Sequence, residues 1–91
     1  MKLTIDTTSR FRKDYKLAVR RGYDMSILES VVEILARGEL LPEKYCDHDL
    51  IGNYKGCREC HLKPDWLLVY QIFDDELILL LTRTGSHNDI F

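Results

Sequence analysis

The chain has 91 residues, of which 45% are hydrophobic and 10% aromatic, and this composition allows a packed core and excludes a disordered polypeptide. We expect one small domain over residues 1–91. The net charge of −2, from 13 basic and 15 acidic residues, argues on its own against a nucleic-acid partner. Residues 1–6 contain an acid before any apolar run, and the longest apolar run, 77–81, is too short for a membrane span. We therefore expect a cytoplasmic protein with no membrane partner, and its three cysteines should be reduced.

The first half of the sequence predicts a strand followed by two helices. Residues 3–5 alternate as a short strand does. Side-chain oxygens at 7–9 can cap a helix that carries apolar residues on one face and ends at Gly22. Asp24 can cap a second helix, which ends at Gly38. The short turn between them predicts that the two helices are antiparallel neighbours.

The second half predicts three strands after an ordered loop. The loop covers 39–56, and the strands cover 57–63, 66–73 and 77–84, with a tail at 86–91. The strand 66–73 is almost wholly apolar, which is typical of a central strand covered on both faces. Tight turns between successive strands favour an antiparallel sheet. We therefore predict an α+β fold of order β-α-α-β-β-β, with a mainly antiparallel sheet and both helices packed on one face.

A basic segment interrupts the mildly acidic background. Residues 10–21 contain six basic side chains and one acid. Such a run on a helix is usually a solvated face, and on charge alone this interpretation is favoured. A local basic face can also bind phosphate when the whole chain is slightly acidic.

Residues 57–61 match the C-x-x-C-H pattern of covalent haem attachment. The segment is predicted as a strand, so Cys57 and Cys60 should point to opposite faces of the sheet and cannot reach one cofactor together. A zinc site meets the same difficulty, and the chain has no second C-x-x-C pair. We expect neither metal nor cofactor, and Cys60 should be a small buried apolar residue.

The same alternation places His61 with Glu59 and Lys63 on the face that the helices leave open. A single histidine is more often structural than catalytic. His61, however, is accompanied by other polar and aromatic residues in the neighbouring loops and at the end of the chain, namely His48, Asp65, His87 and Phe91. None of the three histidines falls on an apolar helix stripe, so a buried structural role is disfavoured for the set.

Two blocks, DHDLIGNYKGCRECHLKPDWLLVY (47–70) and RTGSHNDIF (83–91), resemble the YafQ toxins of the RelE/ParE superfamily, and the resemblance extends over essentially the whole chain. The pattern His-x-x-Pro-Asp-Trp followed by Arg-Thr-Gly-x-His is fairly specific. The resemblance implies a RelE-like fold and an endoribonuclease that cuts mRNA, usually on the ribosome. It also implies a cognate antitoxin that silences the toxin in a hetero-oligomeric complex.

The resemblance further implies a set of site residues. His48, His61, Asp65 and His87 would be catalytic, and Arg83 would face the scissile phosphate. Trp66 and Phe91 also match the family's functional positions, and Lys63 joins them as a candidate substrate contact. Metal-independent RNA cleavage needs a base for the 2′-OH and an acid for the leaving 5′ oxygen, and a pKa of about 6.5 suits histidine to both roles.

Among these residues, we expect His61 and Asp65 near the 2′-OH, His87 as the acid and His48 in support. Phe91 could stack on an unpaired base, and Trp66 is placed beside the site. The helix 10–21 would contact ribosomal RNA phosphates. Three alternatives remain: a RelE/ParE-fold toxin that poisons DNA gyrase, a non-enzymatic binding module, and a degenerate toxin that keeps only its antitoxin interface.

Overall fold

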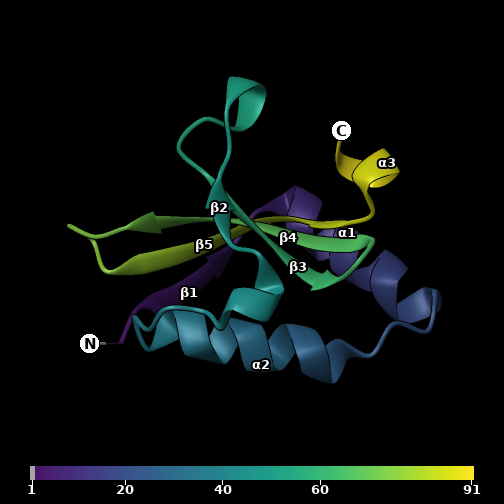
Figure 1. The fold of residues 1–91 in the computed structure, drawn as a ribbon, viewed down its shortest axis with the longest axis horizontal. Coiled ribbons are helices and arrows are strands. Elements are labelled where there is room, and N and C mark those ends of the chain that lie inside the picture. The colour runs from purple at the N-terminus through teal and green to yellow at the C-terminus, as the bar shows by residue number, and fades with distance from the viewer. Residues whose placement is uncertain (1) are drawn as a thin grey trace.

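A computed structural model describes residues 2–91 of the chain (Figure 1). Its regular elements include three α-helices, five strands and two short 3-10 turns. In chain order they are β1 (Thr4–Thr7), α1 (Ser9–Arg20), α2 (Met25–Ala36), η1 (Glu43–Tyr45), β2 (His48–Asp49), η2 (Gly52–Tyr54), β3 (Arg58–Lys63), β4 (Trp66–Phe73), β5 (Ile78–Gly85) and α3 (His87–Ile90). Within the described residues, no helix is both long and apolar enough to cross a bilayer.

The five strands form one sheet in the order β1-β5-β4-β3-β2. The strands β2 to β5 pair antiparallel with their neighbours, whereas β1 runs parallel to β5. The predicted α+β class, the chain order β-α-α-β-β-β of the longer elements and the mainly antiparallel sheet are confirmed. The predicted loop 39–56 contains an additional two-residue strand, β2, which pairs with Arg58 and Glu59 of β3.

Both N-terminal helices begin at the predicted caps. The Thr8 hydroxyl accepts a bond from the Phe11 amide at 2.9 Å, and the Asp24 carboxylate accepts one from the Ser26 amide at 3.1 Å. These bonds satisfy amides that a helix leaves free at its first turn. Both helices bury their apolar stripes against one face of the sheet, as predicted. The resulting core includes Phe11, Leu28, Val31, Leu35, Cys60, Leu62, Trp66, Leu68, Tyr70, Leu79 and Leu81.

The opposite face of the sheet is covered in part. Cys57, Leu67 and Val69 form a second buried cluster with Ile90 of α3, and the loop residues Leu50 and Tyr54 pack against it. Cys57 and Cys60 therefore belong to clusters on different faces, as the predicted alternation requires. The residues expected to form only a tail fold into the helical turn α3, which begins with a capping box between Ser86 and Asp89.

A β-bulge in β5 decides which face Arg83 occupies. Val69 pairs with Arg83, but the next residue, Tyr70, pairs with Leu81, so Thr82 is the extra residue. Leu81 points into the core under the helices, whereas Arg83 lies on the same side as Val69. The bulge therefore brings an arginine to the face that carries the histidines.

Candidate functional site

Five aromatic rings form a continuous row across the partly covered face of the sheet. The ring centroids of His48 and His61 are 6.2 Å apart, those of His61 and His87 are 6.0 Å apart, and those of His87 and Phe91 are 6.1 Å apart. Tyr54 continues the row, with its ring 5.6 Å from that of Phe91. The three histidines come from β2, β3 and α3, so the fold brings together side chains that are distant in the sequence.

Glu59 is the buried carboxylate of the row. Its Oε2 lies 2.9 Å from Nε2 of His48 and 3.5 Å from Nε2 of His61. Its side chain is only 5% exposed, and its Oε1 is buried without a hydrogen-bond partner in the structure. A buried carboxylate with an unused acceptor favours a positive charge or a proton donor beside it. Glu59 can therefore support a positively charged form of either imidazole.

His87 and Asp65 make a second, exposed pair at the other end of the row. Asp65 Oδ1 accepts a hydrogen bond from the His87 backbone amide at 3.2 Å and lies 3.5 Å from the ring Nδ1. Because His87 opens α3, the placement of its ring depends on that turn. Asp65, which is expected near the 2′-OH together with His61, makes these contacts with His87.

Asp89 holds α3 against the body of the protein. It accepts a bond from Arg21, the residue that follows α1, at 2.7 Å and another from the Ser86 amide at 2.9 Å. The Arg21 bond, followed by the Ser86 bond, holds the pKa of the Asp89 carboxyl well below its usual range. The neighbouring Gly85 has a φ of +155°, and a Cβ there would meet Asp89 at 2.9 Å. A side chain at position 85 would therefore displace the carboxylate that holds α3.

Arg83 is buried beneath this face and is already paired. Its Nε and Nη2 donate to the two carboxylate oxygens of Asp14 at 2.7 and 3.2 Å, and its side chain is 9% exposed. This pairing raises the pKa of Arg83. Nη2 also donates to the Asp89 carbonyl at 3.2 Å, and Nη1 to the Tyr54 hydroxyl at 3.4 Å. Arg83 thus connects α1, β5, η2 and α3 beneath the row of rings.

The three predicted substrate contacts differ in position. Phe91 belongs to the row and is 60% exposed, so a nucleobase can reach it. Trp66 is buried in the core under the helices, where its indole N–H donates to Thr84 and its ring lies against Tyr23. Lys63 is exposed at the end of β3. Only Phe91 of these three has ring contacts with the histidine row.

The ligand atoms of His48, Glu59 and His61 all lie within 4.8 Å of one another, so these three residues could hold a metal ion. Two imidazoles and a carboxylate are common ligands of Zn²⁺ and other transition metals. The unpartnered Glu59 oxygen fits such an ion as well as it fits a proton donor. Of the C-x-x-C-H ligands considered above, only His61 belongs to this group, and Cys60 lies in the core on the opposite face of the sheet.

Glu59, Tyr54 and Asp14 are part of the site, but sequence reasoning did not assign them to it. The strand alternation did place Glu59 on the face of His61, and that placement was the available signal. Tyr54 lies in a loop without periodicity. Asp14 contacts Arg83 across 69 positions of sequence, and no local pattern reveals such a pair.

Comparisons with known proteins identify the family of the chain. Residues 3–91 match the family model described as the bacterial toxin of the type II toxin-antitoxin system, YafQ. The mRNA interferase toxin YafQ of Escherichia coli K12 is 40% identical over 88 residues, which cover 96% of this chain and 94% of that protein.

Two solved structures have nearly the same fold. A metal-bound toxin from Helicobacter pylori is 52% identical, has a TM-score of 0.92, and covers 98% of this chain and 99% of its own. YafQ in the Escherichia coli DinJ–YafQ toxin-antitoxin complex is 37% identical, with a TM-score of 0.90 over 100% and 99% of the two chains. With a family model that spans nearly every residue and a fold that superimposes over the whole chain, this protein belongs to the YafQ family of bacterial type II toxin-antitoxin toxins.

Proposed function

We propose that the chain is an endoribonuclease toxin that cleaves mRNA by acid–base attack of the substrate's own 2′-OH, without a metal in the chemical step. The row of three imidazoles backed by the buried Glu59 carboxylate carries this proposal. The activity named for its Escherichia coli relative points to the same substrate class.

The contacts support a division of roles along the row. His61, 3.5 Å from the Glu59 carboxylate, is the general base that removes the 2′-OH proton, and Glu59 stabilises the imidazolium that results. His48, on the other side of the same carboxylate, orients Glu59 and shares its charge. His87 stands 6.0 Å from His61 between ring centroids and protonates the leaving 5′ oxygen, with Asp65 holding its ring.

Other residues in and around the row are assigned to binding of the substrate. Phe91 stacks on an unpaired base next to the cleaved bond. Arg83 supplies positive charge from below and becomes a phosphate ligand only if Asp14 gives up part of its bidentate contact. Lys63, at the exposed end of β3, contacts the backbone farther along, and Trp66 supports the site from the core.

The cellular setting follows from the same family. We propose that the chain acts in the cytoplasm on mRNA being translated, and that a cognate antitoxin binds it in a hetero-oligomer, as DinJ binds YafQ in the Escherichia coli complex. The exposed basic side chains of α1 would contact ribosomal RNA. Arg21, just after α1, is already engaged by Asp89, and Arg12 donates to Thr7, so the contact rests on Arg10, Lys13, Lys16 and Arg20.

The test is to induce the wild-type chain and the His87→Ala variant separately in cells and to map new 5′ ends on a translated reporter mRNA. Cuts in frame with codons, seen for the wild type and lost in the variant, support the proposal. Growth arrest without new cuts would instead support a toxin of the same fold that poisons a protein target such as DNA gyrase.

A further inference from the structure

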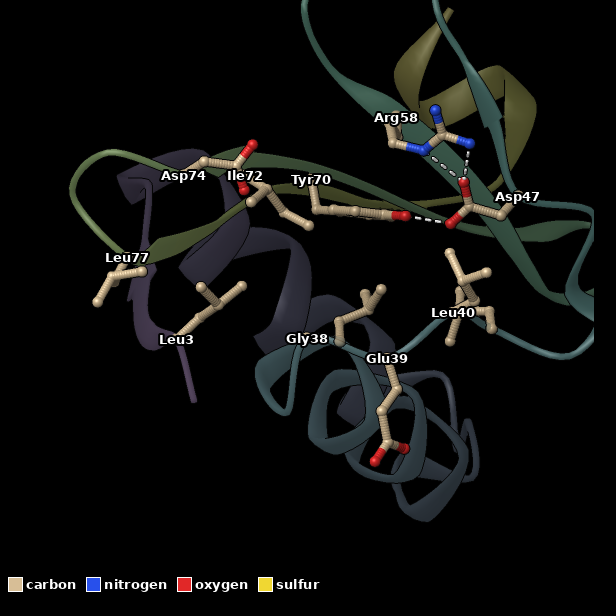
Figure 2. A pocket seen from close by; sticks show the side chains of 12 residues that line it. Leu3, Gly38, Glu39, Leu40, Asp47, Arg58, Tyr70, Ile72, Asp74 and Leu77 are labelled. Carbon is tan, nitrogen blue, oxygen red and sulfur yellow. Dashed lines mark hydrogen bonds and ion pairs between the residues drawn. The ribbon is translucent and has the colours of Figure 1, made fainter. Parts of the chain in front are cut away.

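A second network of polar side chains lies on the opposite face of the sheet from the histidine row. The Asp47 carboxylate accepts a hydrogen bond from the buried Tyr70 hydroxyl through Oδ2 and one from Arg58 Nε through Oδ1 at 2.6 Å (Figure 2). A further Arg58 nitrogen, Nη1, donates to Asp49 at 2.6 Å. The proposed chemistry uses none of these residues.

The network belongs to the core side of the sheet. Tyr70 is 1% exposed and packs in the core under the helices, and Arg58 pairs with it across β3 and β4. Burial, followed by the bond to Asp47, raises the pKa of the Tyr70 hydroxyl. Burial, followed by the nearby Asp47 charge, raises the pKa of the Cys60 thiol to about 12. The Asp47 carboxylate therefore sits beside the core and faces away from the histidine row.

His48 is the next residue in the chain and points to the other face, where its Nε2 meets Glu59. The backbone alone holds this segment weakly, because β2 has two residues, both exposed, at the edge of the sheet. The side-chain bonds of Asp47 to Tyr70 and Arg58 fasten the segment to the two strands beneath it. Because successive side chains of a strand alternate between faces, fixing Asp47 on one face fixes the direction of His48 on the other.

Apolar residues do not cover this anchor completely. A groove of about 750 Å³ opens beside it, between the sheet and the end of α2, and Asp47, Arg58 and Tyr70 all line it. Figure 2 shows the Tyr70 hydroxyl and the Asp47 carboxylate meeting at the border of this space, with Leu40 on its other side. The Leu40 side chain is 96% exposed and does not close over the network. Tyr45 and Leu50, on either side of the segment, pack against the two buried clusters, and the hydrogen bonds of Asp47 hold the residues between them.

We propose that Asp47 is a positioning residue for the reaction, which acts through Tyr70 and Arg58 to hold β2 so that His48 stays against Glu59. This inference rests on the catalytic role proposed above for the His48, Glu59 and His61 group. Loss of the anchor lets the edge strand move, and a displacement of about 1 Å at a reacting group can cost roughly 10²-fold in rate.

The test compares Asp47→Ala with Tyr70→Phe, which keeps the ring and removes only the hydroxyl. The matched control is Asp49→Asn, which removes the neighbouring, 82% exposed carboxylate from the same arginine. Asp47→Asn keeps an acceptor oxygen and should restore part of the function. Each purified variant is checked for folding by thermal unfolding. Two measurements follow: the nuclear Overhauser contact between the His48 and His61 rings, and the dependence of mRNA cleavage rate on enzyme concentration.

We expect Asp47→Ala and Tyr70→Phe to lose the ring-to-ring contact and to lower the maximal rate by about 10²- and 10-fold respectively, with little change in the concentration for half-maximal rate. Asp49→Asn should keep the ring-to-ring contact and the maximal cleavage rate of the wild type. A retained contact and a retained rate in Tyr70→Phe and Asp47→Ala would overturn the inference. If His48→Ala also cleaves at the wild-type rate, the failure lies with the proposed role of His48, whereas the ring contact still tests the anchor.

Discussion

The Oε2 atom of Glu59 stands between two imidazoles, 2.9 Å from Nε2 of His48 and 3.5 Å from Nε2 of His61. Its other oxygen is buried without a partner. A carboxylate in this position costs free energy unless positive charge develops next to it, and in the proposed reaction the transfer of a proton to His61 would supply that charge.

Glu59→Gln keeps the shape of the side chain and removes its charge. The amide cannot stabilise an imidazolium, so we expect the cleavage rate to fall by about 10²-fold or more while the fold is kept. The rate is measured on a translated mRNA, with folding checked by circular dichroism. The matched control is Glu76→Gln in the exposed turn before β5, which should cleave as the wild type does. A Glu59→Gln variant of normal rate would remove Glu59 from the chemistry.

Removal of the Asp14 carboxylate by Asp14→Ala leaves the buried Arg83 guanidinium without its bidentate partner and frees the Thr84 amide. An unpaired buried charge is costly, so the free energy of unfolding should drop by about 3 kcal/mol, measured by urea denaturation. Activity should fall as well, because Arg83 also ties α3 and η2 beneath the row. If Asp14→Ala is as stable as the wild type, the pair is not a structural support.

The bond from Arg21 to Asp89 predicts a dependence of stability on pH. The pKa of Asp89 is lowered in the folded chain, so its contribution to stability is complete above the unfolded pKa of about 3.9 and is lost as pH falls below it. Asp89→Asn should therefore melt at a lower temperature than the wild type at pH 7, and the two melting curves should converge in acid.

The control for Asp89 is Asp75→Asn, in the exposed turn between β4 and β5. It removes the same charge without touching α3 and should leave the melting temperature at pH 7 unchanged. If the difference in melting temperature between Asp89→Asn and the wild type stays constant from pH 7 down to pH 2, the assigned ion pair is contradicted.

Transition-metal ions should inhibit the enzyme. If His48, Glu59 and His61 ligate Zn²⁺, the nitrogen lone pair of His61 is no longer free to accept a proton. We expect one Zn²⁺ per chain in calorimetric titration of untagged protein, cleavage that falls as that site fills, and recovery when a chelator is added. Glu59→Gln should bind the ion more weakly. Cleavage that rises with Zn²⁺ would contradict metal-independent chemistry.

The sequence predicted most of the scaffold because each long element has a strong local pattern. The helices carry apolar stripes between Thr8 or Asp24 at the start and glycine at the end, and β3 and β4 carry clear strand patterns. The strand β2 was not predicted, because two exposed residues have no periodicity. The bulge at Thr82 was missed for a similar reason, since it becomes visible only in the register of β5 against β4.

The sequence predicted which residues form the candidate site better than it predicted which of them contact one another. Alternation along β3 correctly placed His61 on the face away from the helices, and the resemblance pointed to His48 and His87. The burial of the Glu59 side chain could not be predicted, because charged side chains are rarely fully buried. The link between Asp65 and His87 also depends on how α3 folds back, which the sequence of the tail did not reveal.

The most direct test of the central claim uses an mRNA with a single 2′-deoxynucleotide at the position that the wild-type chain cuts. The reaction is run in a reconstituted translation system and the fragments are sequenced. Attack by the 2′-OH predicts that the all-ribose message gives a 2′,3′-cyclic phosphate and a 5′-hydroxyl, and that the substituted message is not cut there. Cleavage at the deoxynucleotide, with a 5′-phosphate on the downstream fragment, would contradict the account.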